Sequence, residues 1–228
     1  MNLEPYYQKY TQEIVDKAIE KLNYKEVTTM PKDENPEYPI LYIFRHGQSE
    51  DNEEMIFSGW RDAKLTQKGI DQALSLAEML KNKKIDYLYA STQIRAIDTL
   101  KYAISFNENA KELEIHTDPR LRERSYGDLQ GTSKLELFLT DEALCNEYRR
   151  SYYKKANNGE SLEEVVKRVE EFIIELIPFM KERNINVAIS CHGNSIRGFR
   201  KYFENLSPEE VSKLETPLGS DYLAYTIK

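Results

Sequence analysis

The chain is poor in cysteine, histidine and tryptophan, and it has no long hydrophobic run. Its 228 residues include two cysteines, three histidines and one tryptophan. Two cysteines, Cys145 and Cys191, are too few for a disulfide framework or a structural zinc cluster, and they suit a reducing compartment. No apolar stretch approaches the ~20 residues that span a bilayer, and the residues after Met1 are polar and tyrosine-rich. We therefore expect a cytoplasmic protein that does not engage a membrane.

Positive charge is also scarce. Lys and Arg number 32 against 39 Asp and Glu, which gives a net charge of -7. Sequence-independent binding of nucleic acid needs a broad basic surface, so we exclude nucleic acid as a partner. A hydrophobic content of 40% suits one sizeable core rather than two. The sequence leaves the oligomeric state open, and a homo-oligomer remains compatible with it.

The first 38 residues form a distinct N-terminal segment. Apolar side chains at helical spacing predict one amphipathic helix within residues 1–30, namely Ile14, Val15, Ala18, Ile19 and Leu22. Pro31, Pro36 and Pro39 follow and predict a linker, because proline lacks an amide donor and restricts the residue before it. We expect residues 1–38 to be a helical extension and linker, and residues 39–228 to be a single domain.

From Ile40 onward, short apolar runs alternate with amphipathic segments, the pattern of an α/β fold. The predicted strands are Ile40 to Phe44, Ile85 to Tyr89, Leu113 to His116, Asn186 to Ser190 and Tyr222 to Ile227. The predicted helices are Gln67 to Lys81, Ile94 to Phe106 and Leu162 to Lys181, the last ended or kinked by Pro178. We expect a three-layer α/β/α sandwich around a mostly parallel sheet, with a small helical cap over residues 120–160.

Two of the predicted strands end in the same way. Arg45-His46-Gly47 follows the first strand, and Cys191-His192-Gly193 follows the fourth. One His-Gly pair alone is most simply a capped turn, whereas two pairs at two strand ends indicate a site, because ligands of open α/β sheets bind beyond the carboxyl ends of the strands. Arg95 opens a helix after another strand. Arg45, Arg95, His46 and His192 together predict a cationic pocket that suits a phosphoryl group.

These motifs carry a family resemblance. Arg45-His46-Gly47, Arg95 and His192-Gly193 resemble the histidine phosphatase superfamily, whose members phosphorylate a histidine transiently. Within it, the sequence is most similar to the cofactor-dependent phosphoglycerate mutases from about Ile40 to the C-terminus. The further matching segments are Ser58-Gly59-Trp60, Leu65-Thr66-Gln67-Lys68-Gly69, Glu123-Arg124-Ser125-Tyr126-Gly127-Asp128-Leu129-Gln130-Gly131, Gly159-Glu160-Ser161-Leu162 and His192-Gly193-Asn194-Ser195.

The resemblance implies catalytic roles that agree with the chemistry of these side chains. His46 would be the nucleophile and form a phosphoramidate. Arg45, Arg95 and His192 would bind the oxygens of the transferring group. Glu123 would act as general acid and base for the substrate hydroxyl. No metal is implied, because cationic side chains supply the positive charge.

The resemblance also implies a clamp for a small phosphorylated acid and 2,3-bisphosphoglycerate as the phosphoryl primer. The residues assigned to substrate binding are Ser49, Asn52, Ser58, Gly59, Arg124, Tyr126, Lys134, Arg149, Arg150 and Asn194. Seen alone, Arg149-Arg150 is equally compatible with a solvated helix face. The expected partner is a small phosphorylated glycerate, and the expected reaction interconverts 3-phosphoglycerate and 2-phosphoglycerate in glycolysis and gluconeogenesis.

Four departures from the mutase pattern keep other functions open. Gln48 replaces a more usual Glu, Asp51 stands where mutases often have Trp, only eight residues separate Arg150 from Gly159, and the expected C-terminal tail is missing or minimal. Water that reaches phospho-His46 would make the protein a phosphomonoester phosphatase. A non-catalytic module that binds a phosphorylated ligand is the third reading. His116 is interpreted as a structural or surface histidine, and Trp60 as a core or pocket-wall residue.

Overall fold

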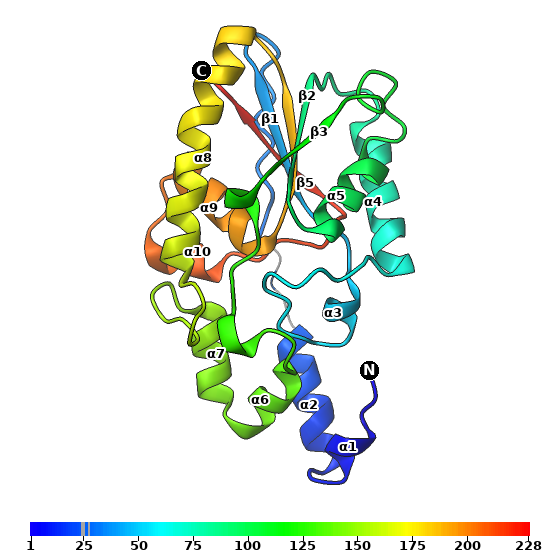
Figure 1. Ribbon diagram of the computed structural model, residues 1–228, viewed down its shortest axis with the longest axis vertical. Coiled ribbons are helices and arrows are strands. Elements are labelled where there is room, and N and C mark those ends of the chain that lie inside the picture. The colour runs from blue at the N-terminus through cyan, green and yellow to red at the C-terminus, as the bar shows by residue number, and fades with distance from the viewer. Residues whose placement is uncertain (24–25, 27) are drawn as a thin grey trace.

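A computed structural model of the chain describes residues 1–23, 26 and 28–228. Its described residues contain a five-stranded sheet in the order β3-β2-β4-β1-β5 (Figure 1). The strands are β1 (Ile40–Arg45), β2 (Tyr87–Ser91), β3 (Ile115–Asp118), β4 (Val187–Cys191) and β5 (Tyr222–Thr226). All neighbours run parallel except β5, which is antiparallel to β1. The predicted α/β fold with a mostly parallel sheet is confirmed.

Alternating side chains of β1 pack into the hydrophobic cores on the two faces of the sheet. Leu41 and Ile43 point into a core with α8 (Leu162–Arg183) and α9 (Gly193–Glu204), whereas Tyr42 and Phe44 join the opposite core. That second core includes α4 (Gln67–Leu80) and α5 (Ile94–Ala103), which lie on the other side of the sheet (Figure 1). Apolar residues of the sheet are buried on both sides, among them Ile40, Ile43, Leu88, Val187 and Ile189.

Strands β2 and β3 begin two residues later than predicted. Ile85 is buried, but the carbonyl of Asn186 accepts hydrogen bonds from the amides of both Asp86 and Tyr87. The parallel ladder therefore starts at Tyr87, and Ile85 contributes an apolar side chain from the turn before it. An apolar residue that is expected to be buried can therefore lie in the turn before a strand as well as in the strand itself.

Helix α8 continues through Pro178 to Arg183, so of the two effects predicted for this proline, an end or a kink, the end is wrong. Proline removes the hydrogen bond to the carbonyl four residues earlier. That carbonyl belongs to Ile174, which lies on the solvent face with a relative exposure of 62%. Water can replace the lost donor there, and the buried face of the helix holds it against the sheet.

The N-terminal segment forms α2 (Gln12–Asn23), which contains all the apolar residues of the predicted amphipathic helix, and a short helix α1 (Glu4–Tyr7) that the sequence did not predict. The Thr11 hydroxyl accepts a hydrogen bond from the amide of Ile14 and so begins α2 as a new helix. Val15, Ala18 and Leu22 of α2 are buried in a cluster with side chains of α6 (Lys134–Thr140) and α7 (Glu142–Arg150). The segment is therefore an integral part of the cap.

The proline-rich stretch lies along the edge strand β5. The Pro31 carbonyl accepts from the Ala224 amide at 2.9 Å, and the Asp33 amide donates to the Ala224 carbonyl at 2.9 Å. The Pro39 carbonyl accepts from the amide of Ile227. This stretch links the cap to the sheet, and it also covers part of an otherwise open sheet edge.

The cap lies below the carboxyl ends of the parallel strands in the view of Figure 1. It contains α1, α2, α6 and α7, while α3 (Glu50–Glu53) lies between it and the sheet. Short 3-10 turns at Pro119–Leu121 and Gly127–Leu129 lead into it, and α10 (Pro208–Lys213) follows α9. In the described part of the chain, every helix is too short or too polar to cross a membrane.

Candidate active site

The two His-Gly motifs meet because β1 and β4 are parallel neighbours. Arg45 is paired with Cys191 in the ladder, and the His46 amide donates to the Cys191 carbonyl at 3.0 Å. The rings of His46 and His192 consequently lie with their centroids 4.9 Å apart and their planes at 58°. Two histidines that are far apart in sequence thus share one site at the end of the sheet.

The tautomer of neutral His46 follows from its hydrogen bond. Its Nδ1 lies 2.7 Å from the carbonyl oxygen of Gly47, which can only accept. Nδ1 therefore carries the proton, and the lone pair of the neutral ring is on Nε2. A neutral imidazole nitrogen held in this way is a nucleophile.

Three backbone segments approach one another closely at position 47, where only glycine fits. A Cβ on Gly47 would lie 2.2 Å from the carbonyl oxygen of Gly69, at the start of α4. Gly219 has a φ of +50° and packs against Gly47 from the loop before β5. These contacts hold the backbone beside His46 in place, so the glycine of this motif serves chain packing.

His192 is fully buried, and neither ring nitrogen has a hydrogen-bond partner among the described residues. Burial, followed by the charges of Arg95, His46 and Arg45, lowers the pKa of His192 well below its ordinary value. The ring is therefore neutral at neutral pH and offers one N–H donor. Buried polar atoms of this kind need a partner, which an oxygen of a bound ligand can supply.

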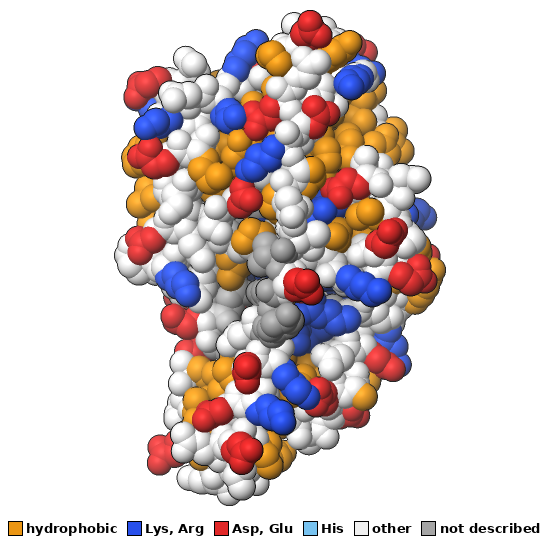
Figure 2. Space-filling view, turned by 180° about the vertical axis from the view of Figure 1, so that it is seen from behind, with side chains coloured by type: hydrophobic (Ala, Val, Ile, Leu, Met, Phe, Trp, Pro, Cys, Tyr) orange, Lys and Arg blue, Asp and Glu red, His pale blue; other side chains and the backbone are white. Residues whose placement is uncertain are grey.

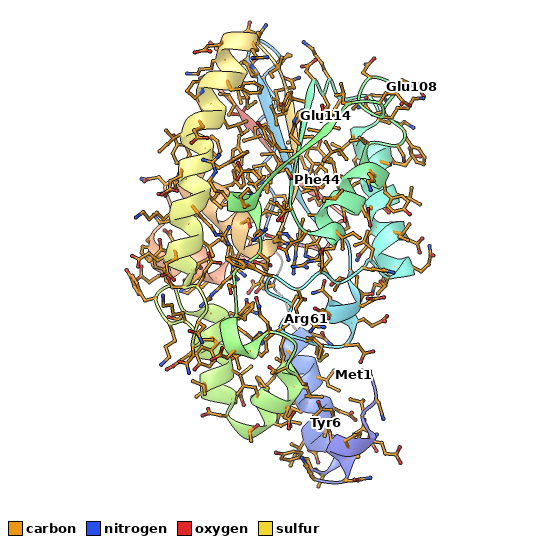
Figure 3. The ribbon with its side chains drawn as sticks, in the orientation of Figure 1. Met1, Tyr6, Phe44, Arg61, Glu108 and Glu114 are labelled. Atoms are coloured by element: carbon orange, nitrogen blue, oxygen red, sulfur yellow. The ribbon has the colours of Figure 1, made fainter. Side chains whose placement is uncertain are left out.

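Two arginines flank the histidines. Arg45 donates from Nη1 to the Thr216 carbonyl at 2.9 Å, while its buried Nε has no partner in the described part of the chain. Arg95 donates to the carbonyls of Arg61 and Gly59 at 2.7 and 2.9 Å. Arg61 lies between the sheet and the cap (Figure 3). Burial lowers the pKa of Arg95 to about 10, so it remains a cation at neutral pH.

Glu123 is held by the start of α9. Its Oε1 accepts from the Asn194 amide at 3.2 Å, from Asn194 Nδ2 at 2.9 Å and from the Arg124 amide at 2.8 Å. An anionic side chain at a helix N-terminus is stabilised by the helix dipole. Among the described contacts all three hydrogen bonds end on Oε1, which leaves Oε2 for proton exchange.

The backbone of Glu123 is also fixed on both sides. Its amide donates to Gln93 Oε1 at 2.9 Å. Its carbonyl accepts from Trp60 Nε1 at 2.8 Å and from Arg168 Nη2 at 3.0 Å. Trp60 is 45% exposed and is absent from the cavity wall, so it supports Glu123 from outside. These contacts hold the carboxylate of Glu123 in the site.

A cavity of about 210 Å³ opens beside these residues. Its wall contains both sheet and cap residues, and Lys and Arg side chains gather at the constriction between the two bodies in Figure 2. Glu123 and Glu215 are the carboxylates of the described wall. The described cationic wall residues are Arg45, Arg95, Lys134, Arg149, Arg150 and Arg197. A protein with a net charge of -7 thus encloses a cavity with a cationic lining.

The structure brings most of the predicted residues to this cavity. The predicted residues in its wall are Arg45, His46, Asn52, Ser58, Gly59, Arg95, Glu123, Tyr126, Lys134, Arg149, Arg150 and Asn194. His192 is not one of these wall residues, and its ring lies 4.9 Å from that of His46. Ser49 caps α3, where its hydroxyl accepts from the Asn52 amide. Arg124 is directed into the cap, where it donates to the carbonyls of Glu160 and Lys154.

Sequence reasoning missed several wall residues, including Leu22, Asn23, Arg197 and Glu215. Arg197 carried a usable signal, because it follows Asn194 by three positions and so lies on the same face of α9. Its Nη1 donates to Asn194 Oδ1 at 2.9 Å. The other three reach the cavity through tertiary packing, which the sequence pattern does not report. His116, by contrast, stacks on Tyr87 at 4.4 Å outside the cavity wall.

Comparison with known proteins agrees with this geometry. Residues 41–225 match the model of the histidine phosphatase superfamily (branch 1). The chain belongs to this superfamily. A 2,3-bisphosphoglycerate-dependent phosphoglycerate mutase of Cytophaga hutchinsonii is 37% identical, with 81% of this chain and 86% of that protein covered. Phosphoglycerate mutase 1 of Saccharomyces cerevisiae is also 37% identical, with coverages of 79% and 84%.

Solved structures of this superfamily share the fold. A mycobacterial glucosyl-3-phosphoglycerate phosphatase complexed with VO3 matches with a TM-score of 0.72 and 24% identity, over 82% of this chain and 92% of that one. The α-ribazole phosphatase of Shigella flexneri matches with a TM-score of 0.70 and 24% identity, over 81% and 89%. At this level of identity the likeness concerns the fold alone.

Proposed function

We propose that the protein is a 2,3-bisphosphoglycerate-dependent phosphoglycerate mutase, which interconverts 3-phosphoglycerate and 2-phosphoglycerate through phospho-His46. The observation that carries the proposal is that two separate sets of cationic side chains line one small cavity. Arg45 and Arg95 flank His46 on the sheet side, while Lys134, Arg149 and Arg150 come from cap helices. A substrate with a phosphate at one end and a carboxylate at the other is complementary to this arrangement.

The cavity has a volume of about 210 Å³, which admits a small phosphorylated acid. Relatives that are 33–37% identical carry the mutase name, which agrees with this substrate class.

In the proposed reaction, His46 Nε2 attacks phosphorus while the bond from phosphorus to the substrate oxygen breaks. Glu123 gives that oxygen a proton. In the second half, a glycerate hydroxyl attacks the phosphorus of phospho-His46, the bond from phosphorus to Nε2 breaks, and Glu123 takes the hydroxyl proton. Arg45, Arg95 and the N–H of His192 stabilise the oxygens of the transferring group.

The wall residues suit 2,3-bisphosphoglycerate as the primer. Arg45 Nε and Ser58 Oγ are buried without a hydrogen-bond partner among the described residues, so they can donate to a phosphate. Arg149 and Arg150 offer charge for the remaining anionic groups. When bound, 2,3-bisphosphoglycerate supplies the phosphoryl group that resides on His46. The chain's own residues bind this group, orient it and exclude water from it.

Phosphomonoester hydrolysis is the second candidate function, and Gln48 favours it. Gln48 lines the cavity, and its Oε1 accepts from the Thr66 hydroxyl at 2.9 Å. A neutral amide here matches the choice that is common in phosphatases of the superfamily. In a hydrolase, water rather than glycerate would accept the phosphoryl group from His46.

Phosphorus NMR distinguishes the two functions. The protein receives 3-phosphoglycerate with and without catalytic 2,3-bisphosphoglycerate, and 2-phosphoglycerate and free phosphate are followed together. We expect the isomer to form only with the bisphosphate and with little free phosphate. Free phosphate without the isomer would establish a hydrolase. His46→Ala is the control, and it should abolish both products because it removes the nucleophile.

A further inference from the structure

Glu215 is a wall residue to which the proposed mechanism gives no role. It follows α10 in the loop that leads to β5. Thr28 holds its backbone, because the Thr28 amide donates to the Glu215 carbonyl at 3.2 Å and the Thr28 hydroxyl accepts from the Glu215 amide at 3.3 Å. The side chain of Glu215 is only 12% exposed.

The carboxylate of Glu215 lies among the arginines of the cavity. It forms an ion pair with Arg150, and its Oε1 lies 3.6 Å from Arg197 Nη2. Arg197 is anchored separately, since its Nε and Nη2 donate to the Leu214 carbonyl at 3.0 and 2.7 Å. Glu215 therefore occupies the position beside Arg150 that an anionic group of a ligand would take.

We propose that Glu215 is a built-in competitor for Arg150, which limits how strongly the cavity holds the second anionic group of a small ligand. The identity of that ligand rests on the proposed function, but competition at Arg150 requires only that the ligand carries two anionic groups. Arg150, Arg197 and Glu215 carry a combined charge of one positive unit. Without the Glu215 carboxylate it would be two, and a ligand would bind without displacing or repelling a buried carboxylate.

Competition requires a charged Arg150 and favours ligands with two anionic groups. Burial and the neighbouring Arg149 lower the pKa of Arg150 to about 10, so this arginine remains a cation at neutral pH. A ligand with a single anionic group, such as inorganic phosphate, gains too little to replace Glu215 at Arg150. A ligand with two anionic groups is anchored at His46 and can compete.

The alternative role, in which Glu215 positions Arg150 for the ligand, predicts that removing Glu215 weakens binding. If the ion pair only holds Arg150 in the orientation that the ligand requires, then removing the carboxylate lets the guanidinium move and weakens binding. Competition predicts tighter binding on the same substitution. The sign of the change in affinity therefore separates the two roles.

The test is calorimetric binding in a His46→Ala background, which cannot turn the ligand over. Glu215→Gln removes the charge and keeps the shape. We expect this variant to bind 3-phosphoglycerate and inorganic pyrophosphate about tenfold more tightly, as for the loss of one like charge beside a part-buried anion. Inorganic phosphate should change by less than about threefold, because it occupies only the group around His46.

Two matched variants control for charge and geometry. Glu209→Gln makes the same change of net charge at an exposed position outside the wall, and it should leave all three affinities unchanged. Glu215→Asp keeps the charge and should bind like the parent. If Glu215→Gln does not fold, as judged from its Tm, Glu215→Asn provides a second neutral variant.

Weaker binding of the two-group anions, or an equal change for phosphate and pyrophosphate, would overturn the inference. Pyrophosphate makes the result independent of the substrate. If 3-phosphoglycerate does not bind at all but pyrophosphate binds more tightly to Glu215→Gln, the proposed mutase function fails while the competitor role stands. If 3-phosphoglycerate binds equally to parent and variant, the competitor role fails while the function stands.

Discussion

His46 and Glu123 are held in place mainly through contacts of their backbones and immediate neighbours. The amide of His46 is bound to β4, and Gly47 packs against Gly69. Glu123 accepts hydrogen bonds on its carboxylate and its carbonyl and donates one from its amide, and the partners come from four different parts of the chain. Phosphoryl transfer depends mainly on positioning and charge. Because these side chains are already held in place, less entropy has to be lost to orient them during the reaction.

His192 makes the stability of the protein depend on pH. Its pKa is lowered by burial and by the charges of Arg95, His46 and Arg45. The unfolded chain therefore binds a proton near pH 6.5 that the folded protein does not bind until lower pH. The stability that comes from this difference is fully present above pH ~6.5 and is lost as pH falls, by up to ~1.4 kcal/mol per pH unit.

Urea unfolding at pH 7.5, 6.5 and 5.5 measures this dependence. His192→Phe removes the titrating group, so its free energy of unfolding should fall less than that of the parent between pH 6.5 and 5.5. His116→Gln removes a histidine outside the cavity wall and should follow the parent. Parallel curves for the parent and His192→Phe would contradict the prediction, because other groups would then account for the whole pH dependence.

At the scale of elements, α2 is both a core element and a wall of the site. Leu22 and Asn23 line the cavity, and the Leu22 carbonyl accepts from Arg149 Nη2 at 3.2 Å. The segment lies outside the residues matched by the family model, which begin at residue 41. Deleting residues 1–38 would also expose the cap core, at ~1.5–3 kcal/mol for each large apolar side chain. A point substitution is therefore the sharper probe.

Asn23→Asp places a negative charge at the cavity without disturbing that core, since Asn23 is exposed to solvent. We expect the KM for 3-phosphoglycerate to rise roughly two- to fivefold, which corresponds to ~0.5–1 kcal/mol for charges that solvent partly screens. The kcat should stay close to that of the parent. Asn2→Asp makes the same change of charge at the distant start of the chain. An equal rise of KM in both variants would mean that net charge, not the wall position, is responsible.

The sequence predicted the elements that carry strong local patterns. The ends of β1 and β4 were recognisable because apolar runs stop at His-Gly, and α8 begins with a capping box of Ser161 and Glu164, a pattern that a sequence displays. The short helix α1 was missed, because its four residues carry no buried apolar face that a sequence pattern could report. Glu215 and Asn23 were missed for a different reason, since loop and helix ends are brought to the cavity only by the packing of the cap on the sheet.

At the scale of the whole molecule, two electrostatic effects on an anionic substrate oppose each other. The net charge of -7 repels it, whereas the cationic wall of the cavity attracts it. The surface charges are dispersed and exposed, so salt screens them over a Debye length of ~10 Å at 0.1 M. The cations of the wall lie next to the bound substrate and are partly buried, which makes their attraction the larger effect.

The dominance of the wall predicts that salt weakens substrate binding. Between 0.1 and 1 M KCl the Debye length falls from ~10 to ~3 Å, and we expect KM to rise by about three- to tenfold with a smaller change in kcat. Steady-state assays across this range provide the measurement, with sucrose at equal osmolality as the control for solvent effects. A KM that falls with salt would mean that repulsion by the acidic surface outweighs the cavity.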